Sequence, residues 1–359
     1  MNRERLVSVD AFRGATVAAM ILVNNPGDWN HVYAPLQHAA WHGWTPTDLI
    51  FPFFLFLVGA SLAFSSRDTT RAAAVRAVKI FGLGFFMAFY PRFNVETVRI
   101  PGVLPRIALC YFVAFLIKKH FGSRGVLAIT AGCCLGYWAL MTLVPVPGGF
   151  PPNLDPATNL GAWLDRTVFG SHLWVASKTW DPEGLLSSLP AIGTTLFGYL
   201  AGSLFRAGLK PRDIIRRLCI SGVILSVSGL AWDSVFPINK SLWTSSYVLF
   251  TAGISSLILA GLYWITDVRG YKAGTRPFVV YSVNAIIVFV ASGLLAKTLS
   301  LIKVPFGEAA VSSQVLLYQT LFVSWLPPLN ASLAYALANV VFWYGILWWM
   351  DRRGIHVKV

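Results

Sequence analysis

Charged residues are scarce in this sequence. Asp, Glu, Lys and Arg make up 12% of its 359 residues, whereas hydrophobic residues make up 56% and the mean hydropathy is +0.62. A soluble globular chain has roughly 25% charged residues. The composition therefore argues against a soluble core and predicts an all-α polytopic membrane protein.

Acidic residues are fewer than basic residues. The chain has 15 Asp and Glu against 29 Lys and Arg, a formal net charge of +14. Nucleic-acid binding requires a clustered basic face, but here the positive residues fall in short runs between apolar stretches. That distribution argues against a nucleic-acid partner and is typical of the charges that orient membrane helices.

Cysteine is rare, and none of it is placed for a bridge in an outside loop. All four cysteines fall inside apolar stretches, and no C-x-x-C spacing is present; they are Cys110, Cys133, Cys134 and Cys219. The sequence also shows no internal repeat, low-complexity tract or soluble domain. We therefore expect residues 1–359 to form a single transmembrane domain.

Ten apolar stretches are candidates for membrane helices. Most approach the roughly 20 residues that a ~30 Å hydrocarbon core requires, and the third and fourth are shorter. They are 8–24, 48–65, 77–91, 105–117, 126–145, 185–205, 214–232, 245–265, 277–296 and 331–350. A further apolar run, Val315–Leu326, is too short to span, so we expect it to lie in the interface or to re-enter the membrane.

The basic residues predict the orientation. With the N-terminus inside, 20 Lys and Arg fall on the inner side and 8 on the outer side, with Arg13 inside the first span. This excess predicts cytoplasmic N- and C-termini and places the loops 25–47 and 146–184 outside. Asp10 and Arg13 interrupt the first apolar stretch, so we interpret it as a retained helix and not as a signal peptide.

A polar loop rich in His and Trp runs directly into an apolar helix between Asn24 and Gly59. It holds three of the six histidines: His31, His38 and His42. Polar and ionisable side chains at a membrane boundary cost free energy, so those that are kept usually have a function. We therefore single out His38, although an ordinary loop histidine is the alternative.

Thr45-Pro46-Thr47-Asp48 has the pattern of a helix start. Thr45 is the expected N-cap, Pro46 occupies the first helical position, and Asp48 is the reciprocal capping partner. The same geometry would aim His38 and the Asp48 carboxylate at the outer mouth of the helix bundle. Capping and function are therefore compatible at Asp48.

A metal site is a weaker interpretation of the three histidines. The last two are spaced i, i+4, but Pro and Gly flank the region, and neither cysteine nor a set of carboxylates completes a shell. We predict no metal.

Four further polar residues lie in the predicted spans or at their ends. Asp10 and Arg13 share a helix face, where they form either a structural ion pair or a contact for an anionic ligand. Arg106 either snorkels to the surface or has an internal role. Asn284 requires a polar partner inside the bundle or lines a tunnel.

An ordered set of motifs covers nearly the whole chain and resembles one family. Together the motifs resemble the transmembrane acetyltransferases of the heparan-α-glucosaminide N-acetyltransferase family. They are Ser8–Gly14 (SVDAFRG), Val23–Asn24, His38–Trp41 (HAAW), Thr47–Pro52 (TDLIFP), Arg99–Leu104 (RIPGVL) and Asp181–Gly184 (DPEG).

The resemblance implies an acetyltransferase in the bacterial inner membrane. It implies transfer of an acetyl group from cytoplasmic acetyl-CoA to the amine of glucosamine, or of a glucosamine-terminated saccharide, on the far side. His38 falls on the position of the family's catalytic histidine, and Asn24 on an asparagine beside it. A homo-oligomer is a further possibility, and the interaction with membrane lipid follows from the spans.

The remaining candidates receive roles on that hypothesis. Asp48 would hold the His38 tautomer, and Asn24 would hydrogen-bond the thioester carbonyl. The residues expected to bind CoA are Arg13, Lys79 and Arg67, and those expected to bind the acceptor sugar are Trp41, Asn25, Asp181, Glu183 and Asn284.

Two rival functions remain at this stage. One is a membrane O-acyltransferase that acts on an envelope polysaccharide. The other is a sugar transporter, although transporters usually show repeat-related halves, which this sequence lacks.

Overall fold

Most of the chain is helical in the computed structural model, which describes residues 6–65, 69–306 and 309–357. The described residues fall into two compact units. The first takes those of Met1–Ala39, Thr45–Phe51 and Lys272–Val359, and the second takes those of Ala40–Trp44 and Pro52–Tyr271.

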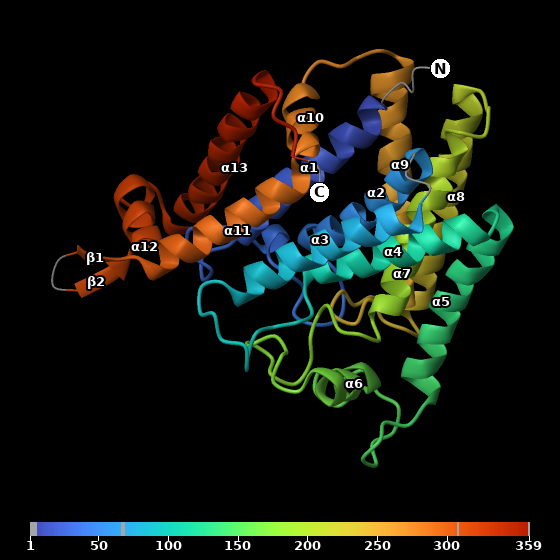
Figure 1. The fold of residues 1–359 in the computed structure, drawn as a ribbon, viewed down its shortest axis with the longest axis horizontal. Helices are drawn as coiled ribbons and strands as arrows, with labels where there is room; N and C mark the ends of the chain where they lie inside the picture. Colours follow the sequence, from blue (N-terminus) through green and yellow to red (C-terminus); the bar gives the residue numbers. More distant parts are fainter. Residues whose placement is uncertain (1–5, 66–68, 307–308, 358–359) are drawn as a thin grey trace. The chain divides into compact units, whose positions relative to one another are not determined.

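The first unit is built around α1 (Val7–Asn24), which packs against α10, α11 and α13 (Figure 1). The Asp10 carboxylate on α1 accepts a hydrogen bond from the Ser282 hydroxyl on α10 at 3.2 Å. The other elements of this unit are η1 (Ala34–Leu36), η2 (Pro46–Leu49), α10 (Arg276–Val283), α11 (Ala285–Leu301), β1 (Lys303–Phe306), β2 (Ala309–Ser312), α12 (Ser313–Tyr318), the π-helical turn η4 (Gln319–Val323) and α13 (Pro328–Arg352).

One feature of the first unit departs from the all-α expectation, and another agrees with the sequence. β1 and β2 form an antiparallel hairpin with Lys303 opposite Ser312, where no strand is predicted. The apolar run Val315–Leu326 is helical as α12 and η4 and ends before Pro327, so it is short, as expected.

The predicted span over 277–296 is not a single straight helix. The chain bends by 82° between α10 and α11, and Asn284 lies at the break. Its side-chain amide donates to the Ile355 carbonyl at 3.2 Å, and its carbonyl oxygen accepts from the Val357 N–H at 2.9 Å. The buried amide thus pairs with the main chain of the C-terminal segment, and no neighbouring helix is needed to satisfy it.

The second unit contains the remaining helices (Figure 1). α3 packs along α4, α5 along α7 and α8 along α9. Its elements are α2 (Ile50–Phe64, from Pro52 onward), α3 (Thr70–Phe89), α4 (Val103–His120), α5 (Ser123–Leu143), α6 (Leu160–Phe169), α7 (Ser188–Leu204), α8 (Pro211–Asp233), α9 (Ser245–Tyr263) and the π-helical turn η3 (Trp264–Val268).

α2 and α7 approach each other backbone to backbone. A Cβ atom at Gly198 would lie 1.9 Å from the Phe56 carbonyl oxygen, so any larger residue would force these helices apart. Gly198 and Gly202 are four residues apart, the small-xxx-small spacing that lets membrane helices pack closely.

Seven helices in the described part of the chain are long and apolar enough to span a membrane, or up to eight if the bent pair α10 and α11 is one span. Two of the ten predicted spans fall short. α4 contains Arg106, Lys118 and Lys119, and α7 has only 17 residues. The count of ten and the cytoplasmic termini therefore stay predictions.

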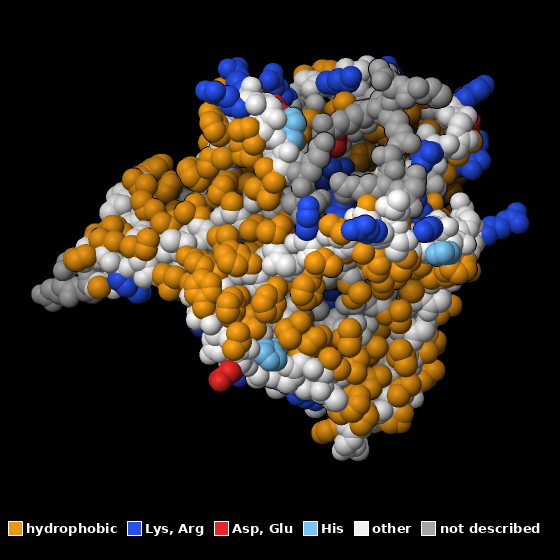
Figure 2. All heavy atoms as spheres, in the orientation of Figure 1, with side chains coloured by type: hydrophobic (Ala, Val, Ile, Leu, Met, Phe, Trp, Pro, Cys, Tyr) orange, Lys and Arg blue, Asp and Glu red, His pale blue; other side chains and the backbone are white. Residues whose placement is uncertain are grey.

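The surface of the second unit agrees with membrane insertion. Figure 2 shows hydrophobic side chains exposed along α5, where Leu127, Leu135 and Leu143 are more than half exposed. Basic residues stand where α4 ends and α5 begins, at Lys118, Lys119 and Arg124. An apolar belt bounded by positive charge is the pattern of a lipid-facing helix.

Candidate active site

The loop that carries His38 is fixed at both ends within the first unit. Near its start, the Gly27 and Asp28 N–H groups donate to the carbonyl and hydroxyl oxygens of Ser332 on α13, at 3.3 and 3.1 Å. Near its end, the Thr45 hydroxyl donates to the Gln37 carbonyl at 2.7 Å. These bonds hold the backbone on both sides of His38.

The predicted helix start is confirmed. Thr45 is the N-cap of η2, Pro46 is its first residue, and Thr45 and Asp48 form a reciprocal capping box. The carboxylate of Asp48 accepts the Thr45 N–H at 3.1 Å and the Ala39 N–H at 3.0 Å, both at Oδ2.

The other oxygen of Asp48 lies 2.7 Å from Nδ1 of His38. The Asp48 side chain is 1% exposed and the His38 side chain 50%. Because a carboxylate only accepts, Nδ1 carries the proton in this contact. A histidine held in this way presents Nε2 as the basic nitrogen, as in a catalytic triad.

A second His–Asp pair in the same loop is missed by the sequence reasoning. Nδ1 of His31 lies 2.7 Å from Oδ2 of Asp28, whose side chain is 30% exposed. The Asn30 N–H and then His31 lower the pKa of Asp28 by hydrogen bonding. The Asp-x-x-His spacing was the available signal.

The two predicted asparagines lie at the end of α1. Asn24 is its last residue and is exposed. Asn25 is buried, and its amide donates to the Ile21 carbonyl at 2.8 Å. This bond satisfies a carbonyl at the helix end, so Asn25 has at least a structural role.

Trp41 and His42 belong to the second unit. The Trp41 indole N–H donates to the Leu154 carbonyl at 3.0 Å, and its ring packs edge-on against Trp180 with centroids 5.1 Å apart. Nδ1 of His42 lies 3.4 Å from the Asn239 amide. In the residues that the structure describes, no group of three or more His, Cys, Asp or Glu could hold a metal ion.

Asp181 and Glu183, predicted as sugar ligands, meet on one arginine. Arg99 donates through Nε and Nη2 to the two oxygens of Asp181, at 2.8 and 2.5 Å, and through Nη2 to Glu183. Burial lowers the pKa of Arg99, but the negative charges of Glu183 and Asp181 outweigh it and raise the pKa. We call these three residues the Arg99 clasp.

Asp165 on α6 bonds to the 181–185 segment, which carries the two carboxylates of the clasp. It is not predicted from the sequence. Its carboxylate accepts the Leu185 N–H at 2.8 Å, and burial raises its pKa to about 6. A Cβ atom at Gly184 would lie 2.1 Å from Oδ2 of Asp165, so only glycine fits against this carboxylate.

Arg106 does not snorkel to the surface. It is 2% exposed, and Nη2 donates to the Gly184 carbonyl at 2.9 Å and to the Ser187 hydroxyl. Its guanidinium lies over the Trp243 ring, 5.1 Å from the centroid. The internal alternative for Arg106 is therefore the correct one.

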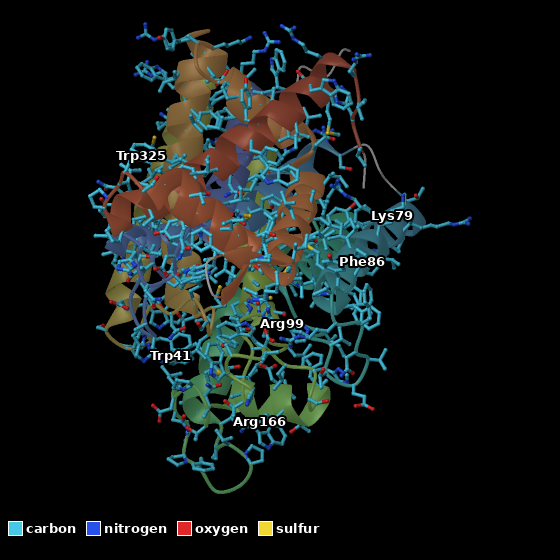
Figure 3. The ribbon with its side chains drawn as sticks, turned by 90° about the vertical axis from the view of Figure 1, so that its left-hand side faces the viewer. Trp41, Lys79, Phe86, Arg99, Arg166 and Trp325 are labelled. Carbon is cyan, nitrogen blue, oxygen red and sulfur yellow. The ribbon has the colours of Figure 1, made fainter. Side chains whose placement is uncertain are left out.

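The three predicted CoA ligands have different surroundings. Arg13 is half-buried and pairs with Asp10 at 3.5 Å, so the expected ion pair is present. Lys79 is exposed on α3, and Figure 3 shows it well separated from Arg99, which lies towards α6. Arg67 lies outside the described residues.

Comparison with known proteins decides the family. Residues 5–229 match the family model described as heparan-alpha-glucosaminide N-acetyltransferase, catalytic. The chain belongs to this family. The part of the chain that matches the heparan-alpha-glucosaminide N-acetyltransferase family includes the His38–Asp48 pair and the Arg99 clasp, and it ends before Asn284.

Two curated relatives carry the same name. The human heparan-alpha-glucosaminide N-acetyltransferase is 29% identical over 351 residues, which cover 80% of this chain and 52% of the human protein. The mouse protein is 28% identical over 359 residues, which cover 82% of this chain and 54% of its own length. The chain thus spans about half the length of the curated relatives it matches.

Proposed function

We propose that this protein is an acetyl-CoA-dependent N-acetyltransferase of the bacterial inner membrane. It transfers the acetyl group of cytoplasmic acetyl-CoA to the amine of glucosamine, or of a glucosamine-terminated saccharide, on the periplasmic side. The observation that carries the proposal is the contact of a half-exposed histidine, His38, with a buried carboxylate, Asp48, in a chain of this family.

The imidazole supplies a proton acceptor. A protonated sugar amine is no nucleophile, so the amine first loses one proton to water. His38 Nε2 then removes a second proton as the neutral amine nitrogen attacks the thioester carbon. The C–S bond then breaks, and the imidazolium returns the proton to the leaving thiolate of CoA. General-base catalysis of this kind contributes about 10²–10⁴-fold.

Asp48 makes that proton transfer easier. Its charge stabilises the imidazolium that forms, and its hydrogen bond to Nδ1 keeps Nε2 as the basic atom. Because contacts with His38, Ala39 and Thr45 fix the carboxylate, it does not need to reorganise when the histidine becomes charged.

The other predicted ligands are assigned by chemistry. Asn24 donates to the thioester oxygen as charge develops there, and Arg13, Lys79 and Arg67 are proposed for the phosphates of CoA. For the acceptor sugar we retain Trp41, Asn25, Asp181, Glu183 and Asn284, although all five already bond within the protein.

A direct transfer and an acyl-histidine intermediate are both compatible with this pair. In the second, Nε2 attacks the thioester first, CoA leaves, and the amine then takes the acetyl group from the imidazole. Single-turnover reaction with radiolabelled acetyl-CoA separates them. Protein-bound label that glucosamine discharges supports the intermediate, and absence of label supports direct transfer.

Transport is the second candidate because of one observation, the 82° break between α10 and α11. Broken helices with polar residues at the break form binding sites in transporters. Flux of labelled glucosamine into proteoliposomes without acetyl-CoA would favour this function.

The central test measures release of CoA thiol by purified protein. Glucosamine and its oligomers are compared with glucose, which has the same ring and only hydroxyl groups. We expect CoA release with glucosamine and an N-acetylated product. Equal release with glucose would instead indicate an O-acyltransferase, and no release with any sugar would contradict acetyl transfer.

A further inference from the structure

The loop between α1 and η2 lies against the first turns of α13. The buried hydroxyl of Ser332 accepts the Asp28 N–H at 3.1 Å and donates to the Asp28 carbonyl at 3.0 Å. The Ser332 carbonyl accepts the Gly27 N–H at 3.3 Å. Further along the loop, the Tyr33 hydroxyl donates to the side-chain carbonyl of Asn330. Two nearby positions of one helix thus hold the loop at two points.

The contact is closely packed at Gly27. A Cβ atom there would lie 2.4 Å from the Tyr318 ring and 3.1 Å from the Cα atom of Ser332. The Tyr318 ring is buried and packs edge-on against Tyr335, with centroids 6.1 Å apart, so it cannot turn aside without opening this aromatic cluster. The backbone of the loop therefore rests directly on α12 and α13.

Short-range bonds connect this contact to the neighbour of His38. At η1, the Leu36 N–H donates to the Tyr33 carbonyl at 2.8 Å, and the Gln37 side-chain amide donates to the Val32 carbonyl at 2.8 Å. Gln37 directly precedes His38. The segment is bonded to itself, as in compact loops that are packed by their own side chains. A displacement at Tyr33 is therefore carried to His38.

α13 is itself fixed within the first unit. The Tyr281 hydroxyl of α10 donates to the Val340 carbonyl at 2.5 Å. Beyond the end of α13, Ile355 and Val357 bond to Asn284 at the break between α10 and α11. Because these contacts hold α13 away from its first turns, the helix can serve as a support for the loop.

We propose that Ser332 and Asn330 are positioning residues for His38. By holding Asp28 and Tyr33, they set where Nε2 of the imidazole lies relative to the acceptor amine. Neither residue belongs to the part of the chain that matches the family model, which ends at residue 229. The inference rests on the proposed role of His38 in acetyl transfer, and it gives α13 a function in that reaction.

A double-mutant cycle tests the bond between Tyr33 and Asn330. Tyr33→Phe and Asn330→Ala each remove one partner, and each should reduce kcat by about 10-fold to 10²-fold, since a misplacement of roughly 1 Å has a cost of this order. KM for acetyl-CoA should change little, because the variants alter the position of His38. The double variant should be no slower than the slower single variant, because all three lose the same bond. Multiplied losses in the double variant would overturn the proposal.

A conservative variant separates positioning from general stability. Asn330→Asp keeps an oxygen that accepts the Tyr33 hydroxyl, and it places a negative charge near the N-terminus of α13, where the helix dipole favours it. Its kcat should therefore match that of the unmodified protein. Asn339→Ala is the control on the same helix, where the amide donates to the Tyr335 carbonyl at 3.0 Å, and it should also leave kcat unchanged. A loss in either variant equal to that in Asn330→Ala would overturn the proposal.

Hydrogen exchange of the whole protein in detergent tests the same link without turnover. Ser332→Ala removes both hydroxyl bonds to Asp28, so the amides at the start of the loop should exchange faster. The proposal predicts that faster exchange extends to residues 36–39, including the Ala39 N–H that bonds to Asp48. Faster exchange confined to the start of the loop, or no change anywhere, would overturn it.

The two measurements also separate this inference from the proposed function. If faster exchange spreads to residues 36–39 but the unmodified protein releases no CoA, acetyl transfer fails and the support of the loop by α13 stands. If the unmodified protein and Asn330→Ala release CoA equally fast, acetyl transfer stands and the positioning role fails.

Discussion

His38 and Asp48 are joined by a contact of 2.7 Å between Nδ1 and Oδ1, and the carboxylate in that contact is almost completely buried. His31 makes a contact of the same length with Asp28, but there the carboxylate is 30% exposed. A buried carboxylate interacts strongly with its partner because the effective dielectric constant is low, whereas water screens the charge of an exposed carboxylate. The two pairs therefore form a natural comparison.

We expect His38→Gln to reduce kcat by about 10²–10⁴-fold, the contribution of a general base. His31→Gln is the matched control, because it removes an imidazole with the same kind of partner from the same loop. It should leave kcat within about threefold. Steady-state CoA release measures both, and an equal loss in the two variants would contradict the assignment of His38.

Asp48→Asn tests whether Asp48 acts by orienting His38 or only by capping η2. It removes the negative charge beside His38, so we expect kcat to fall by about 10²–10⁴-fold. Thr45→Ala removes the N-cap hydroxyl together with its bond to the Gln37 carbonyl, but it keeps the Asp48 charge beside His38. It should cost about 0.5–2 kcal/mol of stability with a much smaller fall in kcat. If Thr45→Ala reduced kcat as strongly as Asp48→Asn, the effect of Asp48 would be structural.

The local part of this site could be predicted because its signals are short-range. A capping box needs only Thr45, Pro46 and Asp48, and the helix that follows is uniformly apolar. Helices in apolar stretches could be predicted for the same reason. The membrane-helix pattern carries its information within about 20 residues.

The long-range part could not be predicted. Arg99 meets Asp181 and Glu183 across more than 80 positions, and Asp165 supports them from an unremarkable amphipathic helix. Asn284, at the bend, is hydrogen-bonded to Ile355 and Val357, far along the chain. None of these pairings leaves a periodic or local pattern, since each arises from tertiary packing.

The Arg99 clasp predicts a large stability effect. Arg99→Gln would leave Asp181 and Glu183 buried without the arginine that hydrogen-bonds to both, which costs about 3–5 kcal/mol for a broken buried pair. Arg166→Gln is the control. Arg166 lies on α6 and donates to the carbonyls of Ala157 and Thr179, and it has no carboxylate partner among the residues that the structure describes.

Thermal unfolding in detergent measures both changes. We expect a clearly larger fall in Tm for Arg99→Gln than for Arg166→Gln. Equal shifts would show that the clasp contributes no more than an ordinary hydrogen-bonded arginine.

Asp165 predicts a pH dependence of stability. Burial raises its pKa from 3.8 to about 6 in the folded state. The folded protein therefore binds this proton more tightly than the unfolded chain, so the contribution of Asp165 to stability is lost as pH rises from about 4 to about 6. Asp165→Asn cannot titrate and should lack this component.

The measurement is the difference in Tm between the protein and Asp165→Asn as a function of pH. The difference should change across pH 4–6 and level off above about 7. A constant difference over the whole range would contradict the raised pKa.

The most direct test of the account is a sided reaction in proteoliposomes with the protein in one orientation. Acetyl-CoA is supplied only on the side of the termini, and glucosamine only on the opposite side. We predict that N-acetylglucosamine forms in the glucosamine compartment and that His38→Gln abolishes it. Product that forms only when both substrates share one compartment would contradict transfer across the membrane.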